Sequence, residues 1–140
     1  MTTTVTVLTE KEVQEAIKKN YSKAETIINN EDKVEKILRK LEKKLKELPL
    51  GLSSLSYVPV MGSLIKSYIE KRYTEIPIAT LAYSLVAILY VVSPIDLIPD
   101  SIGVIGYFDD AAFVAGVLPF IKKDLDDYLE WRNLNDLIVK

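Results

Sequence analysis

Four aspartates are the residues of this sequence whose type and spacing could support chemistry. Asp96 and Asp100 are four positions apart, and Asp109 and Asp110 follow after a short interval that contains two glycines. Carboxylate oxygens are the ligands that hard cations such as Mg²⁺ and Ca²⁺ prefer, so one hypothesis is a divalent-cation site that also serves a metal-dependent hydrolase. The spacing does not match an EF-hand loop, which needs acids at its first, third and fifth positions and a glutamate at its twelfth.

The same stretch also has a structural interpretation, in which the acids end and begin helices. Residues 93–96, Ser-Pro-Ile-Asp, supply an N-cap serine, a proline for the first helical position and an acid that complements the free amides of a helix N-terminus. Residues 90–110 then form a corner that turns one helix back onto the next. The residues of this structural motif are Ser93, Pro94, Asp96, Pro99, Asp100, Gly106, Asp109 and Asp110.

Composition excludes several other classes of function. The chain of 140 residues has no cysteine and no histidine, so zinc–thiolate sites, thiol catalysis and histidine-based acid–base chemistry are absent. The net charge of −2 gives no basic field that would attract nucleic acid. The known loop signatures for phosphate, dinucleotide and serine-hydrolase sites are missing, and no catalytic residue is predicted. The N-terminus does not resemble a secretory signal, so we expect the cytoplasm or the cytoplasmic face of a membrane.

The pattern of apolar residues predicts an all-α domain with three regions. Residues 1–8 form a loose N-terminus, 9–48 an amphipathic helical region and 49–140 a helical core. In the amphipathic region, a capping-box spacing predicts a helix from about Thr9 to Tyr21, with a break or kink near Ser22 and a break at Asn29-Asn30.

Residues 31–48 carry the clearest helical stripe of apolar residues. Its members are Val34, Ile37, Leu38, Leu41, Leu45 and Leu48, and lysines and glutamates fill most other positions. Such a stripe docks on its own domain or binds a second helix. The repeat is short for a coiled coil, which favours docking, but a protein partner or homo-oligomer through this helix stays an alternative.

Residues 76–95 are uncharged over 20 positions, the length that a membrane span requires. No lysine or arginine occurs between Arg72 and Lys122, which is the pattern of a helical hairpin with both ends in the cytoplasm. Against this, the second arm is uncharged only over residues 111–121, and extending it takes in two aspartates. The central helix of a bundle explains the same run, so both interpretations stand.

Two short stretches resemble the signature of the YkvA-like family: YVVSPIDLIPD at residues 90–100 and GYFDD at 106–110. The resemblance covers residues 82–117, and Gly103 departs from it because the family commonly has a proline there. It implies a small α-helical domain, often membrane-associated, with no established activity. The family therefore supplies no catalytic residue to carry over to this chain.

Together these observations predict a small helical bundle around one apolar helix, with a corner rich in proline and aspartate before the last helix. We expect a non-enzymatic scaffold or interaction protein, associated with a membrane surface and bound to no nucleic acid. The alternatives are a protein that binds Mg²⁺ or Ca²⁺ through the aspartates, or an integral membrane hairpin.

Overall fold

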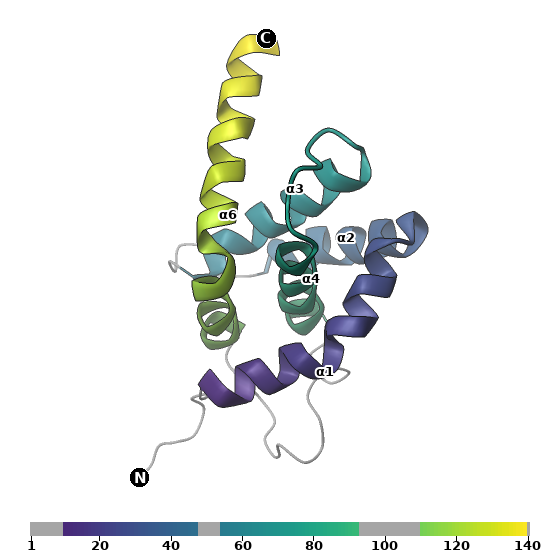
Figure 1. Ribbon diagram of the computed structural model, residues 1–140, viewed down its shortest axis with the longest axis vertical. Helices are drawn as coiled ribbons and strands as arrows, with labels where there is room; N and C mark the ends of the chain where they lie inside the picture. The colour runs from purple at the N-terminus through teal and green to yellow at the C-terminus, as the bar shows by residue number, and fades with distance from the viewer. Residues whose placement is uncertain (1–9, 48–53, 93–109, 140) are drawn as a thin grey trace.

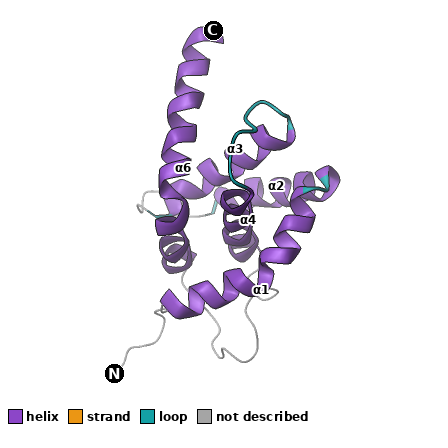
Figure 2. Ribbon diagram, viewed as in Figure 1, coloured by secondary structure: helices purple, strands orange, loops and turns teal. Residues whose placement is uncertain are grey.

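The computed structural model describes residues 10–47, 54–92 and 110–139, and all regular structure in these ranges is helical (Figures 1 and 2). The prediction of an all-α bundle is therefore confirmed. The helices in chain order are α1 (Glu10–Ile28), α2 (Glu31–Leu45), the short 3₁₀ helix η1 (Leu55–Tyr57), α3 (Val58–Ile69), α4 (Ile78–Val92) and α6 (Asp110–Val139).

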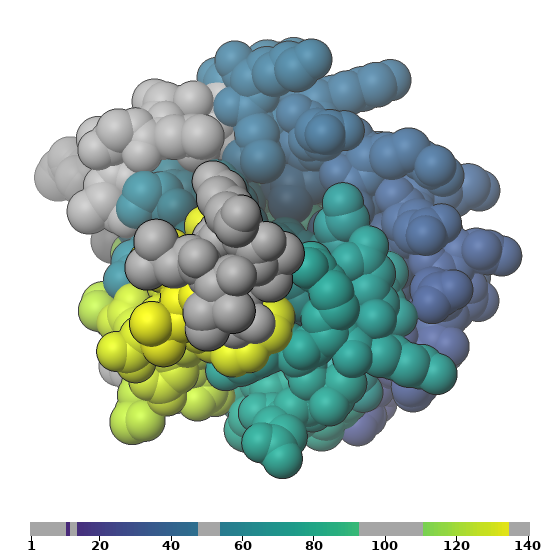
Figure 3. Space-filling model, turned by 90° about the horizontal axis from the view of Figure 1, so that it is seen from above, coloured from purple at the N-terminus to yellow at the C-terminus, as the bar shows by residue number. Residues whose placement is uncertain are grey.

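The apolar helix α4 is the centre of the bundle. It packs against α1, α2, α3 and α6, and ten of its fifteen residues are buried. Seen from above, α1 and α2 lie toward one side of the molecule and α6 toward the other (Figure 3). The uncharged run that begins at Ile76 thus supplies the core helix, as one of the two interpretations of the sequence predicted.

The lengths of the helices bear on the other interpretation of residues 76–95, in which this run spans a membrane. Among the residues that the structure describes, no helix combines the length and the apolar character that crossing a membrane requires. The helix α6 is long, with 30 residues, but it contains charged residues throughout its second half. Figure 1 shows this half of α6 extending beyond the rest of the bundle.

Of the break or kink predicted near Ser22, the break does not occur, because α1 continues as one helix to Ile28; Figure 1 shows this helix bending between its two halves. Ala24, Ile27 and Ile28 are buried, so the apolar stripe of the helix extends past the serine. The threonine of the next turn also fits the helix, since Thr26 Oγ1 donates to the carbonyl of Ser22 at 3.0 Å. Burial of the stripe outweighs the weak preference of serine for a helix end.

The predicted break at Asn29-Asn30 is confirmed, and Asn30 begins the next helix. Its side-chain oxygen accepts a hydrogen bond from the amide of Lys33 at 3.1 Å, which caps α2. The stripe of α2 faces its own domain, with Val34 and Leu41 buried. The approach to α3 is close, because a Cβ at Gly62 would lie 2.9 Å from Leu41 Cδ2.

A Schellman motif ends α3 and turns the chain toward α4. Lys71 adopts a left-handed conformation with φ of 63°, and its amide donates to the carbonyl of Tyr68 at 2.9 Å. The amide of Arg72 donates to the carbonyl of Ser67, also at 2.9 Å. These two bonds satisfy carbonyls that the helix itself leaves free. The Ser67 carbonyl also accepts from the Tyr73 amide, which holds Tyr73 close to α3.

Ser84 lies in the middle of α4 and is fully buried, but its hydroxyl has no hydrogen-bond partner among the described residues. A buried hydroxyl without a partner costs stability, and alanine is a better helix former than serine. We therefore expect Ser84→Ala to raise the free energy of unfolding, by up to about 1 kcal/mol, in urea denaturation.

Thr80 gives a matched control one turn earlier on α4, because its hydroxyl donates to Asp124 Oδ2 at 2.5 Å. Thr80→Val should lower the free energy of unfolding, since it leaves a carboxylate without its donor. Equal destabilisation by the two substitutions would show that the Ser84 hydroxyl is also bonded in the folded protein.

Candidate functional site

The aspartate stretch lies almost entirely outside the described residues. Asp96, Asp100 and Asp109 fall there, as do the other residues of the structural motif before α6. Asp110 is the first residue of α6, but its side chain is not described. The cation-site and capping hypotheses therefore both stay predictions. Within the described part of the chain, no group of three or more carboxylates is close enough to hold a metal ion.

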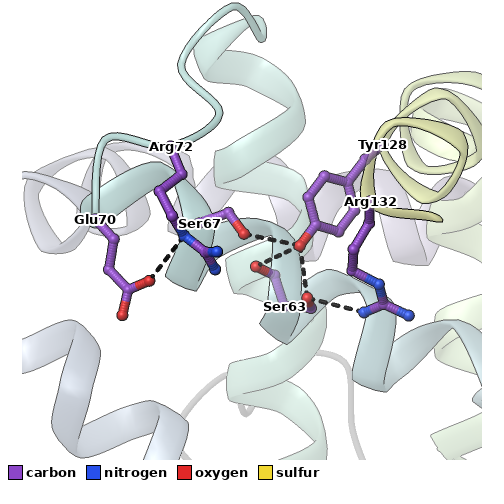
Figure 4. A network of polar contacts seen from close by, with 6 residues as sticks. All are labelled: Ser63, Ser67, Glu70, Arg72, Tyr128 and Arg132. Atoms are coloured by element: carbon purple, nitrogen blue, oxygen red, sulfur yellow. Dashed lines mark hydrogen bonds and ion pairs between the residues drawn. The ribbon is translucent and has the colours of Figure 1, made fainter. Parts of the chain in front are cut away.

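The clearest polar cluster that the structure describes ties α3 to α6, and we call it the α3–α6 clamp. It consists of Ser63 and Ser67 on α3 and Tyr128 and Arg132 on α6 (Figure 4). The Tyr128 hydroxyl lies 2.6 Å from Ser63 Oγ and 2.8 Å from Ser67 Oγ. Tyr128 is fully buried and Ser67 is 1% exposed, so the bond between them lies out of contact with solvent, whereas Ser63 is half-buried.

The directions of the hydrogen bonds in the clamp follow from the groups that can only accept or only donate. The Tyr128 hydroxyl also lies 3.1 Å from the carbonyl of Ser63, which can only accept, so its single proton points there. In that arrangement both serine hydroxyls donate to the Tyr128 oxygen, although by distance alone either atom of each pair could be the donor. Arg132 Nη1 donates to Ser63 Oγ at 3.0 Å and completes the network. Each hydroxyl proton is used inside the fold.

Aromatic rings surround the clamp on the side of the α3–α4 connection. Tyr73 meets Tyr128 edge-on with ring centroids 5.1 Å apart, and Trp131 lies 4.8 Å from Tyr73. Burial, followed by the nearby carboxylates of Asp127 and Asp124, raises the pKa of Tyr73. Tyr128 is thus part of the buried core, with Trp131 half-buried beside it.

A second tie joins η1 to α6 at the surface. The Tyr57 hydroxyl donates to Asp126 Oδ1 and Lys122 Nζ donates to Oδ2 of the same carboxylate, each at 2.8 Å. These hydrogen bonds, first from Lys122 and then from Tyr57, hold the pKa of the Asp126 carboxyl below its usual value. The contact fixes one end of α3 against α6.

Acidification is expected to loosen the Tyr57–Asp126 contact. A carboxyl whose pKa falls on folding stabilises the fold above its unfolded-state pKa, and this contribution is lost as the pH drops through the lower folded-state value. The Asp126 side chain is 44% exposed, so solvent screening keeps the effect small. The ring signals of Tyr57 should shift in NMR spectra between neutral and strongly acidic pH. The same shift in Asp126→Asn would contradict this assignment.

Two concave regions lie on the outside of the bundle. The first, the α2–α3 groove, has a volume of about 460 Å³, and its floor is apolar. Charged side chains of both signs line it: Glu35, Arg39, Glu42, Lys66 and Glu70. Because the acids and bases nearly balance, the groove has no electrostatic preference for one class of ligand.

The second region, which we call the aromatic hollow, has a volume of about 530 Å³ and lies where α1, α4 and α6 meet. Tyr21 contacts Tyr83 edge-on at 6.1 Å, and Tyr83 contacts Phe120 edge-on at 5.7 Å. Phe120 is 42% exposed, which is unusual for a phenylalanine beside two other rings. The remaining lining residues are Gln14, Ile17, Lys18 and Ser22.

Sequence reasoning did not identify these features, although parts of them had a signal. Lys122–Asp126 and Lys123–Asp127 have the four-residue spacing of helical ion pairs, and both pairs form. The α3–α6 clamp and the aromatic hollow had no signal in the sequence, because each joins residues more than 30 positions apart.

These features define the class: a small α-helical bundle organised around one buried apolar helix, with its polar side chains tying the helices together. The model of the family described as "Protein of unknown function (DUF1232)" matches residues 80–116, from the first turn of α4 into α6. The chain is also 33% identical over 78 residues to the "Uncharacterized membrane protein YkvA" of Bacillus subtilis (strain 168). That match covers 56% of this chain and 74% of YkvA.

The chain therefore belongs to the YkvA-like family, as the two stretches around residues 90–110 predicted. No solved structure matches it.

Proposed function

We propose that this chain is a non-enzymatic interaction domain that works at a membrane surface and meets that surface with the outside of its helical bundle. The observation that carries the proposal is the packing of α4. A helix in contact with lipid would expose apolar side chains, whereas Leu81, Leu85 and Ile88 of α4 are fully buried against other helices of the chain. The outer faces of the bundle would then make any contact with a membrane.

The similarity to YkvA supports the proposed location at a membrane surface. YkvA is named a membrane protein, and the match with this chain extends over most of its length. Large apolar side chains are also exposed on the outside of the bundle: Ile78, Phe120 and Leu134. Contiguous apolar surface marks sites that bind a membrane or a partner, and of these three residues Phe120 lies beside another partly exposed ring, that of Tyr83.

The use of the polar side chains supports the non-enzymatic part. The hydroxyls of Ser63, Ser67 and Tyr128 bond one another, and the carboxylates of Asp124 and Asp126 accept hydrogen bonds from other helices. A general base or nucleophile needs a group that is free to meet a substrate. In these clusters the groups serve instead to fix α3, α4 and α6 against one another.

Flotation of the purified full chain with lipid vesicles tests the proposal, and the chain should be prepared without detergent. We expect part of the protein to rise with the vesicles and to be released by a wash with alkaline carbonate. Protein that resists the wash would indicate the integral hairpin instead. Failure to float with vesicles of any composition would contradict a role at the membrane surface.

A further inference from the structure

The aromatic hollow differs from the rest of the surface in its chemistry. Its wall consists of three aromatic rings, each from a different helix: Tyr21 of α1, Tyr83 of α4 and Phe120 of α6. Ile17 adds an aliphatic side chain to the same wall. Tyrosine combines a broad apolar ring with a polar hydroxyl, which suits it to the boundary between water and the interior of a bilayer.

The charge that lines the hollow is positive, although burial and, after it, the nearby Glu25 carboxylate raise the pKa of the Tyr21 phenol. Lys18 is its only charged lining residue, and no carboxylate is among the described residues that line it. Lys18 is exposed and forms no ion pair with the described part of the chain. The α2–α3 groove is the contrast, because three glutamates as well as Arg39 and Lys66 line it and leave it without a preference for an anionic surface. A hollow with one cation and no acid is complementary to lipid phosphate.

We infer that the aromatic hollow is the face that docks on the membrane, with the Phe120 ring among the lipid chains and the Lys18 ammonium at the level of the phosphates. The Tyr21 and Tyr83 rings lie between these two depths and contact the glycerol region. Lysine can keep its charge in the headgroup layer while its aliphatic stem lies along apolar groups. This inference rests on the proposed function and adds the surface and the lipid chemistry to it.

The absence of cysteine from the chain allows the docking face to be located directly. A polarity-sensitive fluorophore can be attached to Phe120→Cys and, as a matched control, to Leu134→Cys. Both residues are exposed apolar positions of α6, and they are 14 residues, about 21 Å, apart along its axis, so the labels differ mainly in their distance from the aromatic hollow. On vesicles of phosphatidylcholine with phosphatidylglycerol, we expect a blue shift and quenching by brominated lipid at 120 and neither effect at 134.

Two substitutions then separate the roles of the ring and the charge. Phe120→Ser should weaken vesicle binding about tenfold on every lipid mixture, because a phenylalanine side chain no longer enters the apolar layer. Lys18→Gln should weaken binding about fivefold on vesicles with phosphatidylglycerol and leave binding to pure phosphatidylcholine unchanged. Melting temperatures near that of the unchanged chain would show that both variants fold.

The outcomes distinguish this inference from the proposed function. If the unchanged chain binds vesicles but the label at 134 responds instead of the label at 120, the docking face is wrong and the proposed function stands. If the unchanged chain binds no vesicle, both the docking face and the proposed function are contradicted. A response at 120 that depends on protein concentration and needs no vesicle would assign the hollow to a second copy of the chain and overturn the inference.

Discussion

Replacing Leu85 by alanine is expected to lower the free energy of unfolding by about 2–5 kcal/mol, the largest effect of any single truncation considered for this protein. Leu85 is fully buried near the middle of α4, the helix against which four others pack. Alanine removes the contacts of the branched side chain and leaves a cavity that these helices can close only in part. Urea denaturation followed by circular dichroism measures the change.

Leu89 provides the control for this substitution, because it lies one turn later on the same helix and is only half-buried. Leu89→Ala changes helix propensity in the same way but removes less buried surface, so its effect should be clearly smaller. If the two substitutions had equal and small effects, α4 would not be the centre of the core.

Replacing Tyr128 by phenylalanine is expected to lower the free energy of unfolding by about 1–3 kcal/mol. The ring keeps its packing against Tyr73 and Trp131, so the loss comes from the hydroxyl alone. Without it, the hydroxyls of Ser63 and Ser67 lose their shared acceptor in a buried site. A buried polar group that loses its partner costs more than the bond itself contributed.

Tyr57→Phe is the matched control, because its hydroxyl also bonds a side chain of another helix, Asp126 of α6, but that bond is only partly buried. Water can replace that bond, so the expected loss is below about 1 kcal/mol. A double-mutant cycle of Tyr128→Phe with Ser67→Ala should be strongly non-additive, since the second substitution removes a group that the first leaves without a partner. Additive effects would show that the two hydroxyls do not interact.

The sequence alone predicted those parts of the fold that depend on residues close together in the chain. Asn30 was recognisable as a helix start because its capping bond reaches only three residues ahead, to the Lys33 amide. The run that forms α4 was recognisable because its side chains are apolar all round, which is typical of a helix buried on every side. The break predicted at Ser22 failed because the long-range burial of Ile27 and Ile28 decides that region.

The clamp could not be predicted for a related reason. Tyr128 reaches Ser67 across 61 positions, and the contact depends on how α3 and α6 cross. Helix periodicity indicates which face of each helix is apolar but not which turn of one helix meets which turn of the other. The aromatic hollow combines three helices and depends even more on their relative placement. The four aspartates show the opposite case, since their spacing is plain in the sequence and their arrangement lies outside the described residues.

If α4 is a core helix that packs within the chain without lipid, hydrogen exchange of its backbone amides in buffer should reveal it. The full chain in detergent-free buffer should show the amides of residues 82–92 among the slowest to exchange, and adding vesicles should leave them unchanged. Rapid exchange of these amides in buffer, with protection that appears only when a bilayer is supplied, would contradict the account.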